Sequence, residues 1–91
     1  MEPLSGAEKR RLRGAAHSLK PVVHLGRDGA DQGVLDEIDR ALEHHQLIKV
    51  RFVAGQDERR ATAREIEQAL SCGVVGMVGH VLILYRPAED D

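Results

Sequence analysis

Two apolar runs near residue 80 are separated by only two residues. Val74–Val78 and Val81–Tyr85 flank the pair Gly79-His80. Because such a short connection joins two strands only as an antiparallel hairpin, the sequence predicts a sheet that contains this hairpin. Any arrangement of the preceding segments must accommodate it.

Strand and helix patterns alternate upstream of the hairpin. Strands are expected at Val22–Leu25 and Leu47–Val53, the second of which alternates apolar and polar side chains. Helices are expected from Ser5 through Leu19, from Asp31 to His44 and from Asp57 to Ser71. Two β-α-β units imply parallel pairing with right-handed crossovers. The predicted fold is therefore α/β, with the order α-β-α-β-α-β-β and a mixed four-stranded sheet packed with helices.

The expected helix ends carry recognisable signals. Ser5 and Glu8 have the spacing of a capping box, and Asp31 is a plausible N-cap. Pro21 should end the first helix, and Gly73 suits the C-cap of the third. The residues expected to face the core are Leu12, Ala16, Leu19, Val34, Leu35, Ile38, Ala41, Leu42, Phe52, Ala63, Ile66, Ala69 and Leu70.

Ninety-one residues are expected to form a single domain, residues 1–91, with a core of about 4–87 and a short acidic tail at 88–91. The sequence has no apolar run long enough to span a membrane, no apolar leader and a single cysteine, Cys72. We therefore expect a cytoplasmic protein that does not bind membranes.

Charge is distributed unevenly along the chain. Residues 1–27 carry six basic and two acidic residues, a net of +4, whereas residues 28–91 carry seven basic and thirteen acidic residues, a net of −6. Within the first expected helix, helical spacing places Lys9, Arg13, His17 and Lys20 on one face, separate from the apolar face. This asymmetry favours a basic surface that binds a polyanion.

The segment Gly26-Arg27-Asp28-Gly29 joins an expected strand to an expected helix. Its glycines allow a sharp turn and close approach of a ligand, and the following helix start favours an anion. Arg27 adds a guanidinium that matches phosphate. Loops of the G-x-x-G kind hold nucleic-acid backbone in KH domains. The spacing does not fit a P-loop or a dinucleotide-binding loop.

Other chemistry is poorly supported. The histidines and Cys72 lack the spacing of a zinc site, and no metal site is expected. Phe52 and Tyr85 are the only aromatic residues, which favours recognition of RNA backbone and shape over base stacking. Arg51 and Arg86 either extend the basic surface or are ordinary exposed charges.

Five segments together resemble a known family, the CRM domain (chloroplast RNA splicing and ribosome maturation), in its bacterial stand-alone, YhbY-like form. They are 4–10 (LSGAEKR), 17–23 (HSLKPVV), the loop 26–29, 38–50 (IDRALEHHQLIKV) and 81–87 (VLILYRP). The resemblance implies a compact RNA-binding fold similar to the C-terminal domain of bacterial translation initiation factor three. It also implies association with ribosomal RNA in precursor large subunits, and neither catalysis nor a cofactor. Asp28 departs from the family, whose members often carry a neutral or basic residue there.

The leading hypothesis is therefore an RNA-binding protein that assists ribosome assembly and is not an enzyme. The expected RNA-binding residues are Gly26, Arg27, Asp28, Gly29, Lys9, Arg10, Arg13 and Lys20. An alternative is a protein-interaction adaptor on the ribosome, which would dock ribosomal proteins on the acidic face of the second and third helices. A weaker one is a phosphate-handling enzyme built around the glycine loop.

Overall fold

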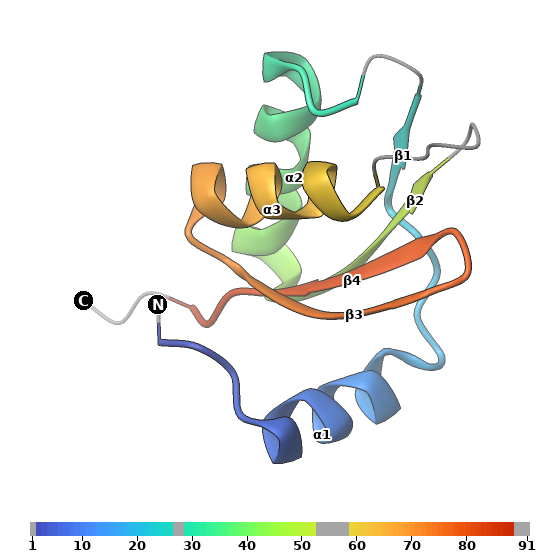
Figure 1. Cartoon of the computed structure of the whole chain (residues 1–91), viewed down its shortest axis with the longest axis vertical. Coiled ribbons are helices and arrows are strands. Elements are labelled where there is room, and N and C mark those ends of the chain that lie inside the picture. Colours follow the sequence, from blue (N-terminus) through green and yellow to red (C-terminus); the bar gives the residue numbers. More distant parts are fainter. Residues whose placement is uncertain (1, 27–28, 53–58, 89–91) are drawn as a thin grey trace.

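The computed structural model describes residues 2–26, 29–52 and 59–88. The elements follow the predicted order (Figure 1). They are α1 (Gly6–Ala16), β1 (Val23–Leu25), α2 (Gln32–His45), β2 (Leu47–Phe52), α3 (Arg59–Leu70), β3 (Gly73–Val78) and β4 (Val81–Tyr85). The expected ends at Val53 and Asp57 lie outside the described residues. No helix in the described segments is long and apolar enough to cross a membrane.

The four strands form one mixed sheet with the order β1-β2-β4-β3. β1 pairs with β2 in parallel, and β4 is antiparallel to both β2 and β3. The hairpin is confirmed, but only the first β-α-β unit forms a parallel pair. β4 occupies the place beside β2 because three successive side chains, Leu82, Ile83 and Leu84, are buried. A strand that is apolar on both faces requires a central position between two layers.

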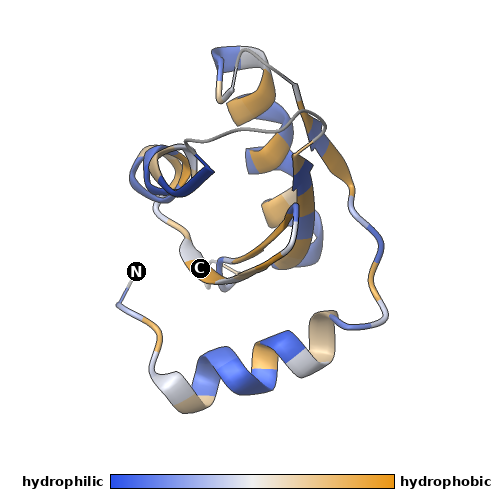
Figure 2. Cartoon of the chain, turned by 45° about the vertical axis from the view of Figure 1, so that its right-hand side comes forward, coloured by the Kyte–Doolittle hydropathy of each residue, from blue (hydrophilic) through white to orange (hydrophobic). Residues whose placement is uncertain are grey.

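Helices cover the two faces of the sheet unequally (Figure 2). α2 and α3 pack over one face and enclose the larger core, which includes Phe52, Ile38 and Ile66. α1 lies on the other face over a smaller core, formed by Leu12, Ala16, Val75 and Ile83. α1 is largely hydrophilic in Figure 2, as expected for a helix that buries only one narrow stripe.

α1 is shorter than the sequence predicts. Its capping box is confirmed, with Glu8 N donating to Ser5 Oγ at 3.1 Å and Ser5 N donating to Glu8 Oε1 at 3.2 Å. The helix ends at Ala16, however, and Leu19 is exposed rather than in the core. The last turn tightens because Leu19 N bonds to Ala16 O, three residues back, at 3.0 Å.

The end of α3 also differs from the prediction. Ser71, with φ of 50°, takes the left-handed position after the helix, and Gly73 instead begins β3. Ala69 is exposed, so its expected place in the core was wrong, whereas Ala63 and Ile66 are buried as predicted. The left-handed residue turns the chain two residues earlier, which leaves Gly73 free to pair with Tyr85.

Candidate nucleic-acid interface

The glycine loop connects β1 to α2, as the sequence predicts. Gly29 N donates to Gly26 O at 3.2 Å, which brings the two ends of the loop together. Gly29 has φ of +70°, a conformation that favours glycine. Arg27 and Asp28 lie outside the described residues. The N-cap of α2 is Asp31, whose carboxylate accepts from Val34 N at 2.9 Å, so the loop leads directly into a capped helix start.

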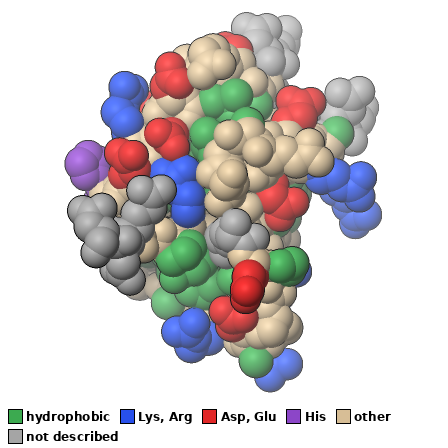
Figure 3. Space-filling model, turned by 90° about the vertical axis from the view of Figure 1, so that its left-hand side faces the viewer, with side chains coloured by type: hydrophobic (Ala, Val, Ile, Leu, Met, Phe, Trp, Pro, Cys, Tyr) green, Lys and Arg blue, Asp and Glu red, His purple; other side chains and the backbone are tan. Residues whose placement is uncertain are grey.

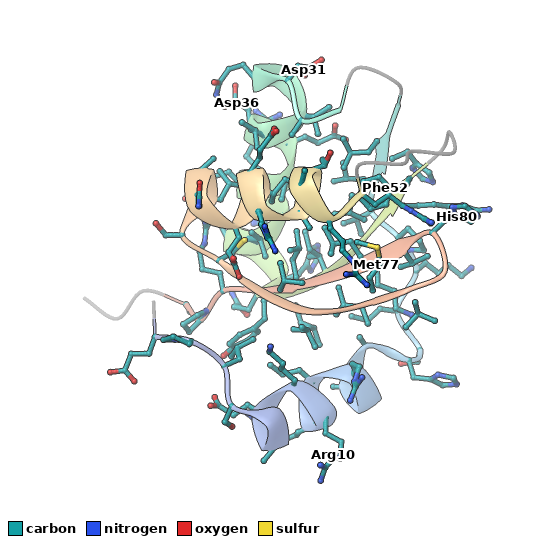
Figure 4. The ribbon with its side chains drawn as sticks, viewed as in Figure 1. Arg10, Asp31, Asp36, Phe52, Met77 and His80 are labelled. Carbon is teal, nitrogen blue, oxygen red and sulfur yellow. The ribbon has the colours of Figure 1, made fainter. Side chains whose placement is uncertain are left out.

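The basic residues of α1 are exposed but point in different directions. Arg10 projects away from the sheet (Figure 4). The stem of Arg13 lies over β3, because a Cβ built on Gly76 would meet Arg13 Cδ at 3.3 Å. Lys9 lines an open pocket that also includes Glu2 and Glu67.

Lys20 does not belong to the α1 face on which it was expected. It follows the helix, in the connection to β1, where it is exposed. This connection is held by Lys49, whose Nζ donates to Leu19 O at 3.0 Å and to His17 O at 3.4 Å. Lys49 is thus a positioning residue that the sequence pattern alone did not identify.

The ends of β1 and α2 that the loop joins lie toward the opposite end of the long axis of the molecule from α1 (Figure 1). Among the described residues expected to bind RNA, Gly26 and Gly29 are therefore not gathered into one cluster with the basic residues of α1. The sheet surface on the α1 side lies between the loop and the basic residues of α1. The four strands carry Lys49 and Arg51 but no aspartate or glutamate. α1 adds four basic residues and one acidic residue, a net of +3. This side of the molecule is consequently basic.

The opposite side has a mixed charge. α2 carries four acidic residues and one arginine, a net of −3, whereas α3 carries three arginines and two glutamates, a net of +1. Figure 3 shows the molecule from a side on which both helix layers are visible, and there acidic and basic side chains are intermingled. Among the described residues of the two helices, the acidic surface expected for an adaptor is therefore confined to α2.

The side chain of Arg86 stabilises the fold. Its guanidinium donates to Asp39 Oδ1 at 2.8 Å, to Leu70 O at 2.9 Å and to Asp39 O at 3.1 Å. These bonds fasten the segment after β4 to α2 and α3. Arg86 does not extend the basic surface, whereas Arg51 is exposed on the α1 side.

The described residues contain no group of three or more His, Cys, Asp and Glu side chains that could hold a metal ion. Cys72 is buried. Burial raises the pKa of its thiol to about 11, so the thiol is protonated at neutral pH.

Comparison with known proteins gives a family match over most of the chain. The sequence profile of the CRS1/YhbY (CRM) domain matches residues 4–86. An RNA-binding protein of Haemophilus influenzae is 46% identical over 92 residues, covering 99% of this chain and 92% of the relative. A protein of Pseudomonas aeruginosa, named a probable RNA-binding protein, is 36% identical over 84 residues, covering 91% and 81%.

The solution structure of another protein has a similar fold. The structure of a hypothetical protein from Staphylococcus aureus, a candidate RNA-binding protein, superimposes with a TM-score of 0.84 at 29% identity. The match covers 97% of this chain and 93% of that one. The expected likeness to the C-terminal domain of translation initiation factor three stays a prediction.

Proposed function

Since this chain belongs to the CRS1/YhbY (CRM) domain family, we propose that it is a cytoplasmic protein that binds ribosomal RNA in precursor large subunits. Its contribution to ribosome assembly would come from binding alone, without catalysis, a cofactor or a small-molecule substrate. Support comes from the relatives named as RNA-binding proteins and from the charge distribution of the fold.

The observation that carries the proposal is the difference between the two sides of the sheet. α1 has a net charge of +3 and lies on strands that contain no acidic residue, whereas α2 on the other side has a net charge of −3. A polyanion would therefore approach the α1 side and be repelled from α2. The glycine loop would contribute Arg27 and, at the exposed Gly26, room for close approach of the RNA backbone.

Salt dependence and substitution test this surface. Each neutralised phosphate contributes about 0.9 to the slope of log affinity against log salt on a duplex, and about 0.7 on a single strand. Replacing Lys9, Arg13 and Arg27 together by Gln should weaken binding by at least about tenfold across RNA sequences and make this slope shallower.

A charge-matched variant provides the control. Arg40, Arg60 and Arg64 are exposed on α2 and α3, and replacing all three by Gln removes the same charge from the other side of the sheet. This variant should bind RNA like the parent. Equal losses in the two variants would show that net charge, and not the α1 side, determines binding.

The identity of the RNA is tested in cells. Crosslinking followed by sequencing of the attached RNA should recover ribosomal RNA from precursor large subunits. Recovery of unrelated RNA alone would contradict the ribosomal part of the proposal while leaving RNA binding intact.

Because the surface of α2 is acidic, a protein-interaction adaptor on the ribosome is a second candidate function. Asp36, Glu37 and Glu43 are exposed there and could dock a basic ribosomal protein. Nuclease treatment of ribosomal fractions separates the two functions. An RNA-binding protein should be released when the RNA is digested, whereas an adaptor should remain with RNA-free proteins.

A further inference from the structure

Four side chains form a continuous row across all the strands of the sheet. His24 on β1 is in register with Arg51 on β2, Arg51 with Val81 on β4, and Val81 with Val78 on β3. Neighbouring strands lie about 4.8 Å apart, so the row extends over roughly 14 Å. It lies at the end of the sheet from which the glycine loop leaves.

Alternation along the strands determines which way the row faces. The neighbours of its members along each strand, including Val23, Phe52, Leu82 and Met77, belong to the core under α2 and α3. Side chains alternate between the two faces of a strand, so the row points to the α1 side.

α1 does not cover this row. The residues that α1 packs against, Val75, Ile83, Leu47 and Tyr85, lie elsewhere on the same face. His24 and Arg51 are exposed, and Val78 is 65% exposed, the highest value among the exposed large hydrophobic side chains of the described residues. Part of the sheet thus faces outward beside α1, with no described helix over it.

The two halves of the row differ chemically. His24 and Arg51 provide ring and guanidinium N–H donors, and the Arg51 fork matches a phosphate. Val81 and Val78 provide an aliphatic surface, which suits the face of a base or a ribose but not a phosphate. No acidic residue on any strand opposes an anion here. The row is therefore complementary to a nucleotide whose phosphate lies over His24 and Arg51 and whose base lies over Val81 and Val78.

We propose that an unpaired nucleotide of the bound RNA lies across this row. The phosphate would contact Arg51 and His24, and the base would pack on Val78 and Val81. This inference rests on the proposed RNA binding and deepens it. The row also links the two separated parts of the proposed interface, since Gly26 follows His24 by two residues and Gly76, under the Arg13 stem, precedes Val78 by two.

Titration with two probes tests the location. Single-stranded oligoadenylate should shift the NMR signals of the Val78 and Val81 methyl groups and of the Arg51 side chain. A blunt RNA duplex of the same length should leave the valine methyl signals nearly unchanged, because its bases are stacked inside the helix. Shifts confined to α1 and the glycine loop with both probes would overturn the row as a binding site.

Two substitutions separate the halves of the row. Arg51→Gln should weaken binding of oligoadenylate and reduce the salt slope by about 0.7, the value for one phosphate on a single strand. Val78→Ser should weaken the same complex by roughly threefold to tenfold without changing the slope, as expected for the loss of a small apolar contact with the base. Neither change should affect the duplex complex as strongly.

The controls keep this inference distinct from the proposed function. Arg64→Gln removes a charge from exposed α3 and should leave oligoadenylate binding unchanged. Because Val78 and Arg51 are exposed, both variants should keep the parental melting temperature. If both variants bind with parental affinity, the row is not a nucleotide-binding site, and the proposed RNA-binding surface at α1 is unaffected. If the parent binds neither probe nor ribosomal RNA, the proposed function itself fails.

Discussion

The ammonium of Lys49 donates a hydrogen bond to the backbone carbonyl of Leu19 at 3.0 Å. The same ammonium reaches His17 O, while the carbonyl of Lys49 accepts from Val22 N at 3.0 Å. A single residue of β2 therefore holds the connection between α1 and β1 at both of its ends. Through this connection it sets the position of the basic helix against the sheet.

Removing this anchor should loosen α1. Lys49→Met keeps the length of the stem but loses the ammonium, and should lower the free energy of unfolding by about 1 kcal/mol, the usual net value for such bonds. Hydrogen exchange should accelerate at the amides of α1 more than in the α2 layer. Lys20→Met removes an exposed charge from the same connection, and in this control both measurements should be unchanged. Uniform acceleration in both layers would argue against a local role for Lys49.

Arg86 should be needed for stability and not for RNA binding. Its side chain makes three bonds to Asp39 and Leu70, and Arg86→Ala should cost about 2 kcal/mol because it leaves partly buried acceptors unpaired. Arg86→Lys should recover only part of this loss, since an ammonium cannot reproduce the planar fork. Chemical denaturation gives the stability, and RNA affinity measured well below the melting temperature should be parental. A loss of affinity in fully folded Arg86→Lys would place this residue in the interface after all.

The two described glycines of the loop form a matched pair. Gly29→Ala places a side chain at φ of +70° and should destabilise the protein by about 1 kcal/mol. Gly26→Ala meets no atom within 4 Å and should leave stability unchanged. If RNA backbone approaches this loop closely, however, the methyl group in Gly26→Ala should still weaken binding. Parental affinity in Gly26→Ala, measured by fluorescence anisotropy, would mean that RNA does not approach the loop at that position.

Cys72 should make stability depend on pH in the alkaline range. Burial raises its pKa from 9.0 to about 11, so the folded state retains a proton that the unfolded state loses earlier. Its contribution is fully present below about pH 9 and declines as the pH rises toward 11. The difference in unfolding free energy between the parent and Cys72→Ala should therefore shrink over this interval. A difference that stays constant would indicate an unperturbed thiol.

Local patterns in the sequence predicted most of the elements. The capping box at Ser5, the Asp31 cap and the alternation that buries Phe52 are set by neighbouring residues, and all three are confirmed. The connection that follows α1 is held instead by Lys49, thirty residues away from Leu19, and no local pattern contains that contact. The position of β4 between β2 and β3 likewise depends on how strongly apolar each of the four strands is on both faces, which requires comparing strands that are far apart in the sequence.

The candidate site was harder to predict for the same reason. Helical spacing placed Lys20 beside Lys9 and Arg13, but this inference required a helix that continues beyond Ala16. The role of Arg86 depends on Asp39, 47 residues away in the chain. The row that contains His24 and Arg51 becomes visible only once the strand order and register are known.

The register shift between Val74 and Gly76 has a consequence for how copies of this domain meet. β3 is an outer strand of the sheet, and an outer strand offers unpaired backbone groups to which another chain can add. The irregularity at Val74–Gly76 interrupts the regular backbone spacing that such an addition requires. The stem of Arg13 crosses the same stretch at Gly76 and keeps a cationic group beside it. One short segment thus discourages edge-to-edge association, and with it the growth of a sheet shared between molecules.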